Sequence, residues 1–137
     1  LLLIPIFSAL RLANFNIDES QSYGFKGLPT PANAFWIASI PFILNHYSED
    51  SFIYLFLSQT INLTILAIIG AILLVILIPL MSLKFKSISF NENFSKYLLL
   101  FISLILFVLF KWFSLPLIIV SYIIISLIFW FFNRLKK

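Results

Sequence analysis

Residues 51–83 read SFIYLFLSQTINLTILAIIGAILLVILIPLMSL, and no charged side chain interrupts them. A helix that crosses a lipid bilayer needs only ~20 predominantly apolar residues. Further along the chain, Lys111 is the one charged residue between Tyr97 and Asn133. These two regions alone can hold three spans, so the sequence predicts a helical protein built within a membrane.

The overall composition agrees with this reading. Hydrophobic residues make up 62% of the 137-residue chain, aromatic residues 18% and charged residues 10%, and the mean hydropathy is +1.10. A soluble domain of this length would have to expose much of that apolar surface to water. The composition therefore predicts an integral membrane protein.

The polar residue types exclude several kinds of site. The chain contains no cysteine and a single histidine, His46, so disulfides, Cys-ligated metals and multi-histidine metal sites within it are excluded. The net charge of +4 comes from cations scattered among apolar segments, without the basic stripe that binding to a nucleic-acid backbone needs. We expect no nucleic-acid partner, because membrane topology explains the positive charge better.

The hydropathy pattern predicts an all-α polytopic membrane protein with four full transmembrane helices plus the end of a truncated one. Proline should kink two of these helices, at Pro41 and at Pro79, and Asp50 with Ser51 supplies a plausible N-cap. The expected elements are a truncated span at 1–13, a polar loop to about residue 31, a span at about 32–47, a long span within 52–83, a polar loop at 84–96, a span at 97–112, a turn at 114–116 and a last span at 116–132.

The chain starts at Leu1, inside an apolar run. Leu1 to Ala9 would form only about the last 14 Å of a helix, roughly half of a bilayer core. We therefore expect residues 1–137 to be a single membrane domain that forms the C-terminal part of a larger protein.

Cations alternate between successive connections. The counts of Lys and Arg run two in 11–31, none in 45–51, three in 84–96, one in 111–115 and three in the C-terminal tail. Loops rich in Lys and Arg stay in the cytoplasm. The alternation predicts a multi-pass protein of the cell inner (cytoplasmic) membrane, with the 11–31 loop and the C-terminus in the cytoplasm.

Polar groups concentrate in RLANFNIDESQSYGFKGLPTPANAF, residues 11–35. Arg11, where the truncated helix ends, is either a snorkelling topological anchor or a ligand for an anionic group such as phosphate. Asn14 would share its helix face. An arginine beside amides can hold a phosphate or a carboxylate through several donors at once. Asp18 and Glu19 are interpreted as a solvated acidic loop rather than a metal pair.

The second half of the same stretch is built to be stiff. Gly27 permits backbone conformations that other residues resist, and Pro29 and Pro31 fix φ twice within GLPTP. Pro31 is well placed at a first helical position. Lys26 lies within this stiff entry to the next helix, and it is either part of a binding site or a solvated topological charge.

The segment SALRLANFNIDESQSYGFKGLPTPANAFWIAS resembles the central segment of bacterial CDP-diacylglycerol–serine O-phosphatidyltransferases, the phosphatidylserine synthases of the CDP-alcohol phosphatidyltransferase superfamily. The close match covers about residues 8–39, with RLANFN and GLPTP as the two half-motifs. The resemblance implies a phospholipid-biosynthetic enzyme that transfers phosphatidyl from CDP-diacylglycerol to L-serine and releases CMP. It implies an active site on the cytoplasmic face of the membrane. Whether the protein forms a homodimer stays open.

The resemblance assigns substrate-binding positions residue by residue. Arg11 matches the family's RLA arginine and would bind lipid phosphate or the serine carboxylate, and Asn16 matches its F-N asparagine. Gly27, Pro29 and Pro31 match the structural G-L-P-x-P loop. Asn14 departs from the family, which more often carries arginine or lysine there, and Lys26 is a candidate local substitute for that cation.

The resemblance also implies Mg²⁺ or Mn²⁺, held by aspartates of a D-G-x-x-A-R and G-x-x-x-D-x-x-x-D signature. This chain lacks that signature, since its aspartates are Asp18 and Asp50 and neither precedes glycine. The metal ligands and the catalytic base are therefore expected upstream, and we expect the fragment alone to be inactive. Two alternatives stay open: another CDP-alcohol phosphatidyltransferase, such as phosphatidylglycerophosphate synthase, and a non-enzymatic polytopic membrane protein.

Overall fold

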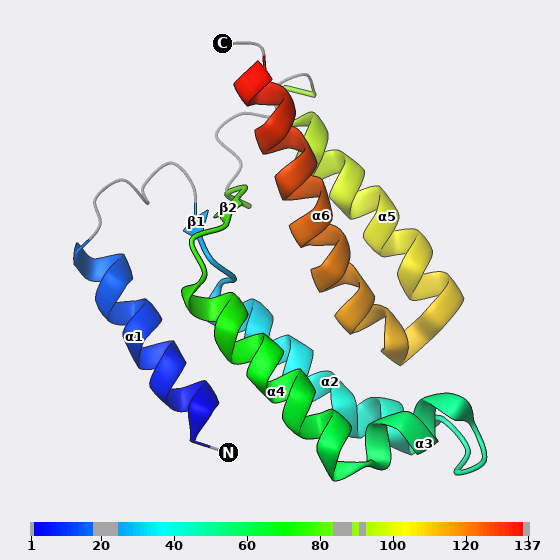
Figure 1. Cartoon of the computed structure of the whole chain (residues 1–137). Coiled ribbons are helices and arrows are strands. Elements are labelled where there is room, and N and C mark those ends of the chain that lie inside the picture. Colours follow the sequence, from blue (N-terminus) through cyan, green and yellow to red (C-terminus); the bar gives the residue numbers. More distant parts are fainter. Residues whose placement is uncertain (1, 18–24, 84–88, 91–92, 136–137) are drawn as a thin grey trace.

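The computed structural model describes residues 2–17, 25–83, 89–90 and 93–135. It is mostly helical, as expected (Figure 1). The elements are α1 (Leu3–Ile17), β1 (Phe25–Lys26), α2 (Thr30–His46), α3 (Phe52–Ser58), α4 (Thr60–Val75), β2 (Pro79–Leu80), α5 (Phe94–Phe110), the 3-10 turn η2 (Lys111–Phe113) and α6 (Ser114–Leu135).

The helices form two groups. α1 packs along α4, and α4 packs in turn against α2, whereas α5 and α6 fold back on each other as a hairpin (Figure 1). The two groups meet where α2 and β2 contact α6. This junction lies beside the GLPTP segment, because residues 27–29 connect β1 to α2.

A two-residue antiparallel β pair joins segments far apart in the sequence, with Phe25 opposite Leu80 and Lys26 opposite Pro79. The chain was expected to be all-α, so the pair is an addition to the fold. Pro79 was expected to kink a helix, but α4 has already ended at Val75 and Pro79 lies in β2. Because proline cannot donate a ladder hydrogen bond, it suits the edge of so short a pair.

The expected long span within 52–83 is broken. α3 and α4 meet at a bend of 76° beside Gln59. Polar side chains compensate the interrupted helical ladder: the Asn62 Nδ2 donates to the Phe56 carbonyl over 2.8 Å, and the Ser58 hydroxyl donates to the Leu55 carbonyl. The expected N-cap of α3 is confirmed, since the Ser51 hydroxyl accepts from the Tyr54 N–H at 3.2 Å.

The turn of the C-terminal hairpin lies earlier than expected. It occupies η2, Lys111–Phe113, and α6 begins at Ser114 with Pro116 in its first turn, where a missing N–H costs little. Lys111 takes a positive φ of 48° with ψ −119°. α2 likewise starts with a proline in its first turn and continues through Pro41 to His46.

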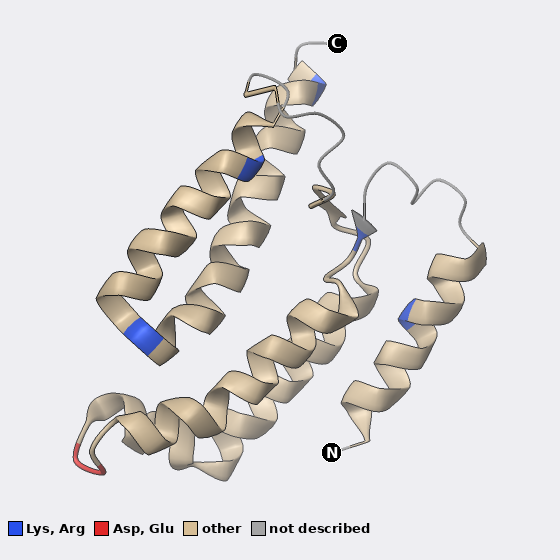
Figure 2. Ribbon diagram, turned by 180° about the vertical axis from the view of Figure 1, so that it is seen from behind, with Lys and Arg blue, Asp and Glu red and all other residues tan. Residues whose placement is uncertain are grey.

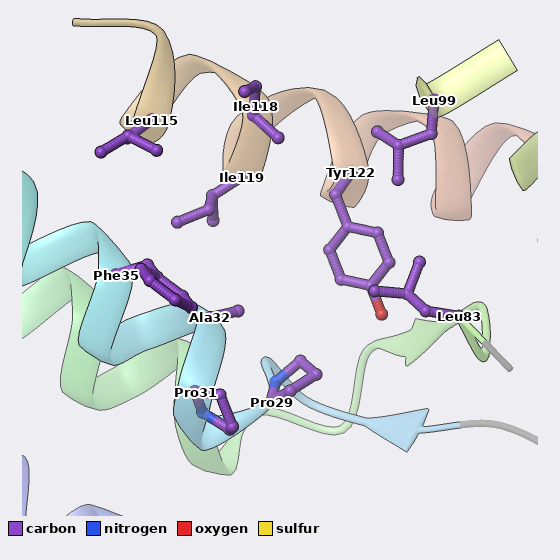
Figure 3. A pocket seen from close by; sticks show the side chains of 10 residues that line it. All are labelled: Pro29, Pro31, Ala32, Phe35, Leu83, Leu99, Leu115, Ile118, Ile119 and Tyr122. Atoms are coloured by element: carbon purple, nitrogen blue, oxygen red, sulfur yellow. The ribbon is translucent and has the colours of Figure 1, made fainter. Parts of the chain in front are cut away.

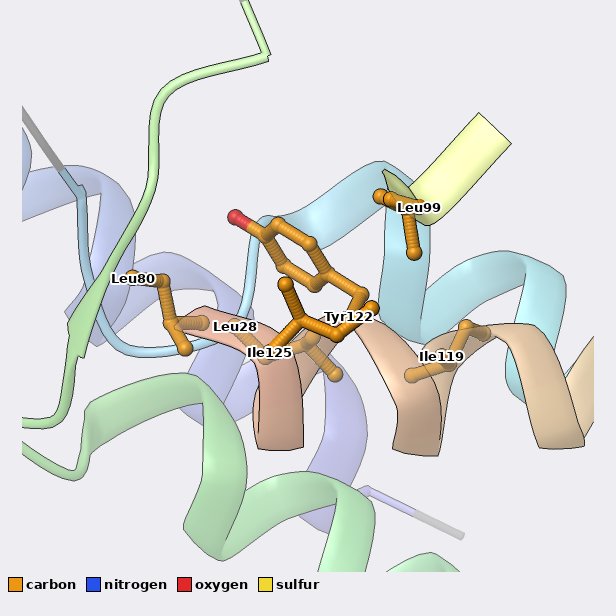
Figure 4. Close-up of a cluster of buried hydrophobic side chains, with 6 residues drawn as sticks. All are labelled: Leu28, Leu80, Leu99, Ile119, Tyr122 and Ile125. Atoms are coloured by element: carbon orange, nitrogen blue, oxygen red, sulfur yellow. The ribbon is translucent and has the colours of Figure 1, made fainter. Parts of the chain in front are cut away.

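The buried core is small and sits at the junction of the two helix groups (Figure 4). Its central side chains come from the GLPTP segment, β2, α5 and α6: Leu28, Leu80, Leu99, Ile119, Tyr122 and Ile125. Many large apolar side chains elsewhere are exposed, and Phe101, Leu104 and Val108 of α5 are each more than half exposed.

Helix length and composition bear directly on the number of spans. Among the residues that the structure describes, one helical stretch, Phe94–Leu135 of the α5–α6 hairpin, is long and apolar enough to cross a membrane, and the bent α3–α4 pair would make two if it forms one span. α2 has 17 residues and α1 has 15, so each falls below the ~20 residues of a full span. The lengths and composition of the helices therefore do not confirm the four full transmembrane helices that the sequence predicts.

Candidate functional site

Arg11 lies deeper in its helix than the sequence suggested. The first span was expected to end near residue 13, but α1 continues to Ile17, about 9 Å beyond Arg11 at 1.5 Å per residue. The side chain is partly buried, and its Nε and Nη2 atoms are shielded from solvent. Arg11 is therefore positioned inside the structure rather than at the point where the chain leaves the helix.

Tyr122 of α6 lies within electrostatic range of the Arg11 guanidinium. Tyr122 is 4% exposed, and its hydroxyl donates to the Met81 carbonyl over 2.8 Å. The Met81 N–H in turn donates to the Ser126 hydroxyl. Both backbone polar groups of Met81 are therefore hydrogen-bonded to side chains of α6.

The first two residues of the GLPTP segment are hydrogen-bonded to α4 and to the residues that follow it. The Gly27 N–H donates to the Ile78 carbonyl at 2.9 Å, and the Leu28 N–H donates to the Leu73 carbonyl at 2.8 Å. Gly27 has φ +80°, and a Cβ at this position would lie 2.6 Å from the Leu74 carbonyl oxygen. The expected need for glycine is confirmed, because both the backbone angle and the space exclude a side chain.

The two prolines of GLPTP border a cavity between α2 and α6. Pro29 directly precedes α2, and Pro31 occupies its first turn, as expected from the sequence. The cavity has a volume of about 620 Å³ (Figure 3). Tyr122 lines it together with the prolines and further apolar side chains, so the same tyrosine borders the cavity and interacts with Arg11.

The remaining residues assigned from the sequence lie nearer the surface. Asn14 and Asn16 are both exposed on α1, whereas Arg11 on the same helix is partly buried. Lys26 is exposed in β1. Tyr122 thus lines a cavity with Pro29 and Pro31 and lies within electrostatic range of Arg11, whereas the two asparagines are exposed on α1. Asp18 and Glu19 lie outside the described residues.

Asn33 was not singled out from the sequence, although it lies in the same motif. Its side chain is 1% exposed, and its Oδ1 atom has no hydrogen-bond partner in the described structure. A Cβ added to Gly70 of α4 would lie 2.6 Å from that oxygen. The Asn33 amide of α2 therefore lies against Gly70 of α4, and the two helices approach closely at this point. The signal in the sequence was an amide in the second turn of a predominantly apolar helix.

Several charged residues lie toward the two ends of the described structure, whereas Arg11 on α1 and Lys26 in β1 lie between them (Figure 2). Glu49 and Asp50 follow the end of α2, and Lys111 lies at the same end, because Trp112 beside it stacks on Phe42 with ring centroids 5.0 Å apart. Lys96 in the first turn of α5 and Arg134 in the last turn of α6 mark the opposite end.

The described residues do not by themselves fit the divalent cation that the sequence resemblance implies. Carboxylate clusters are the usual protein ligands of Mg²⁺. Within the described ranges, no group of three His, Cys, Asp or Glu side chains comes together, and Glu49 and Asp50 lie in the loop at the far end of α2 from GLPTP. A divalent cation beside GLPTP would therefore need carboxylate ligands from outside the described residues.

Comparison with known proteins identifies no relative: no family model, curated protein or solved structure matches the chain.

Proposed function

We propose that this chain is the C-terminal part of a membrane-embedded phosphatidylserine synthase, which transfers phosphatidyl from CDP-diacylglycerol to L-serine and releases CMP. The observation that carries the proposal is the link between the two half-motifs. Tyr122 lines the same cavity as Pro29 and Pro31 of GLPTP, and it lies within electrostatic range of Arg11 of RLANFN. One segment whose pattern resembles the family thus borders the cavity, and the other places a cation within electrostatic range of a residue that lines it.

Arg11 suits a role in binding an anion. A guanidinium offers several donors in a fixed fork that matches phosphate and carboxylate oxygens. Its burial in an apolar chain supports a ligand role over a purely topological anchor, since an anchor needs only to reach the interface. In the proposed enzyme Arg11 binds the lipid phosphate or the serine carboxylate.

The GLPTP segment would keep that anion in a fixed position. Its backbone is hydrogen-bonded at Leu28 to Leu73 of α4 and at Gly27 to Ile78 beyond that helix, while Pro29 directly precedes α2 and Pro31 lies in its first turn. In the transfer itself, the serine hydroxyl oxygen bonds to the phosphatidyl phosphorus, the bond from that phosphorus to CMP breaks, and a base takes the hydroxyl proton. Such reactions depend on in-line positioning and on neutralised phosphate charge. Mg²⁺ or Mn²⁺, with ligands and base from upstream, would supply the rest.

A multi-pass location in the cell inner membrane completes the proposal. It is supported by the exposed apolar face of α5 and by aromatic side chains near both ends of the hairpin, where Trp112 stacks on Phe42 and Arg134 lies 5.1 Å over Trp130. The four proposed spans are α2, the bent α3–α4 pair, α5 and α6. The 11–31 loop and the C-terminus would face the cytoplasm.

The test is an acceptor assay on the intact gene product that contains this chain. Membranes holding it are given CDP-diacylglycerol and Mg²⁺ or Mn²⁺, with either L-serine or glycerol phosphate, and CMP release is measured. Serine-dependent release is expected. Release with glycerol phosphate alone would instead identify a phosphatidylglycerophosphate synthase, and no release with either acceptor would favour a non-enzymatic membrane protein. The isolated 137-residue chain is expected to release no CMP above background.

A further inference from the structure

The short helix α3 turns away from the direction of α4, which follows it. The two helices meet at 76°, and the turn is visible in Figure 1. α4 packs beside α2, and the two have similar lengths, since 16 and 17 residues extend about 24 and 26 Å. α4 thus covers the same thickness as α2 without α3. If α4 crosses a bilayer beside α2, α3 lies closer to the membrane plane than to the membrane normal.

α3 has a polar edge and an apolar face. Tyr54 and Ser58 are four residues apart, so they lie on one side of the helix, and Ser51 caps its start by accepting from the Tyr54 N–H. Leu55 lies at the border of this edge. The other side of the helix is apolar: Phe52, Ile53, Phe56 and Leu57. An amphipathic helix of this kind suits a membrane interface, where the polar edge stays among head groups and the apolar face enters the hydrocarbon.

The apolar face of α3 points toward the middle of the other helices. Its four residues line a second cavity of about 370 Å³, whose other walls include Ile40 of α2, Leu66 of α4 and Val120 of α6. Ile40 lies six residues before the end of α2, and Leu66 and Val120 lie six residues after the starts of their helices. All three are therefore about 9 Å inside the ends that are proposed to face outward. The apolar face thus points toward the bilayer interior, as an interfacial helix requires.

Part of the apolar face is open to the surroundings. Phe52 is 81% exposed and Phe56 44%, and their stacked rings have centroids 6.2 Å apart. Exposed apolar side chains continue along α4 at Ile61, Ile65 and Ile69, with no charged residue between. Because this uncharged surface runs over both helices, one partner fits both, and for a helix that crosses a membrane that partner is lipid.

We infer that α3 is an interfacial helix of the outer leaflet and that α4 alone makes the crossing of the bent pair. The partner of its exposed apolar face is the lipid at the boundary between head groups and hydrocarbon. Tyr54 and Ser58 then lie among the head groups, and Glu49 and Asp50, which precede α3, stay in water. The inference rests on the proposed membrane placement and not on the proposed reaction.

The test measures how deep single positions lie in phosphatidylcholine vesicles. The 137-residue chain has no cysteine, so Phe52→Cys, Phe56→Cys, Ile61→Cys and Ile65→Cys each carry one nitroxide spin label, at positions that are exposed in the fold. Electron paramagnetic resonance gives the depth of each label from its accessibility to oxygen, which concentrates in hydrocarbon, and to a nickel chelate, which stays in water.

The two pairs have the same spacing, so the α4 pair is the matched control for the α3 pair. The labels at Phe52 and Phe56 should lie at one depth, near the head groups. The label at Ile65 should lie up to about 6 Å deeper than that at Ile61, because four residues rise that far along a crossing helix. A label at Ser58→Cys, on the polar edge, should lie shallower than the label at Phe56.

Four results would overturn the inference. A label at Phe56 deeper than that at Phe52, by the step seen on α4, would make α3 part of the span. Labels on α3 reached by nickel and not by oxygen would place this helix in water, and labels shielded from both would mean that protein covers it. Equal depths for Ile61 and Ile65 would contradict the membrane placement as well. A lack of serine transferase activity would leave the inference standing.

Discussion

Any side chain at Gly27 is expected to destabilise the fold. Gly27 combines φ +80° with backbone oxygens of α4 directly where a Cβ would lie. We predict that Gly27→Ala destabilises the fold by about 1–3 kcal/mol, as a strained backbone and an overpacked contact both cost free energy. Thermal unfolding in detergent measures this.

Gly27→Asn is the informative companion variant. Asparagine tolerates positive φ better than alanine does, but it still carries the Cβ that meets the Leu74 carbonyl. Both variants should therefore unfold at lower temperature than the parent chain. If Gly27→Asn unfolded at the same temperature as the parent chain, residue 27 would not lie as close to the α4 backbone as the structure places it.

The contact between Asn33 and Gly70 predicts energetic coupling. Gly70→Ala places a methyl group against the Asn33 amide oxygen and should destabilise the chain, whereas the same change in an Asn33→Ala background should cost much less. A double-mutant cycle on thermal unfolding should give a coupling of about 0.5–3 kcal/mol. Additive effects would show that the two side chains do not meet.

These residue-scale contacts were only partly visible in the sequence. GLPTP predicted a rigid turn because Gly and Pro permit or restrict particular φ values by themselves. Tyr122 and Asn33 gave no comparable signal. Their significance comes from partners on other helices, Arg11 and Gly70, and no local pattern encodes which helix faces which.

Hydropathy predicts the helical regions of the chain but neither the bend between α3 and α4 nor the β pair. Apolar runs predicted the helical regions, because backbone groups without water must bond within a helix. The 76° bend beside Gln59 was not predicted, since both halves are uncharged and the pair together is apolar enough for a span. The β pair was not predicted either, because two-residue strands so far apart in the sequence leave no period to detect.

The hairpin turn carries its own prediction. Lys111 has φ 48° and ψ −119°, a conformation that glycine adopts without a steric penalty. Lys111→Gly should stabilise the chain by about 1 kcal/mol. Lys111→Ala removes the same charge but keeps the Cβ, so it serves as the matched control and should show no gain. Equal unfolding temperatures for both variants would mean that charge rather than backbone conformation decides the effect.

The whole molecule is most readily explained by lipid around it. Its main buried cluster lies at the junction of two helix groups, while α5 carries exposed Phe, Leu and Val side chains along its outer face. In water this arrangement would leave a large apolar surface exposed. In a bilayer the same surface is matched to its surroundings.

The proposed membrane placement predicts which loops face the cytoplasm. Because the chain contains no cysteine, single introduced cysteines can be labelled to test this. Ser48→Cys lies between α2 and α3, and Ser89→Cys lies just before α5. A membrane-impermeant maleimide applied to intact spheroplasts should label Ser48→Cys and should reach Ser89→Cys only after lysis. Labelling of both sites before lysis would contradict the assigned sides.

The central claim, that Arg11 serves a phosphatidyl transfer, is tested most directly by serine-dependent CMP release from the intact gene product carrying Arg11→Ala. We predict a loss of about 2–4 kcal/mol in transition-state stabilisation, or about thirtyfold to a thousandfold in rate. Arg11→Lys should recover part of it. Arg134→Ala, which removes a cation at the far end of α6, should leave the rate unchanged. An Arg11→Ala enzyme as fast as the parent would contradict the account.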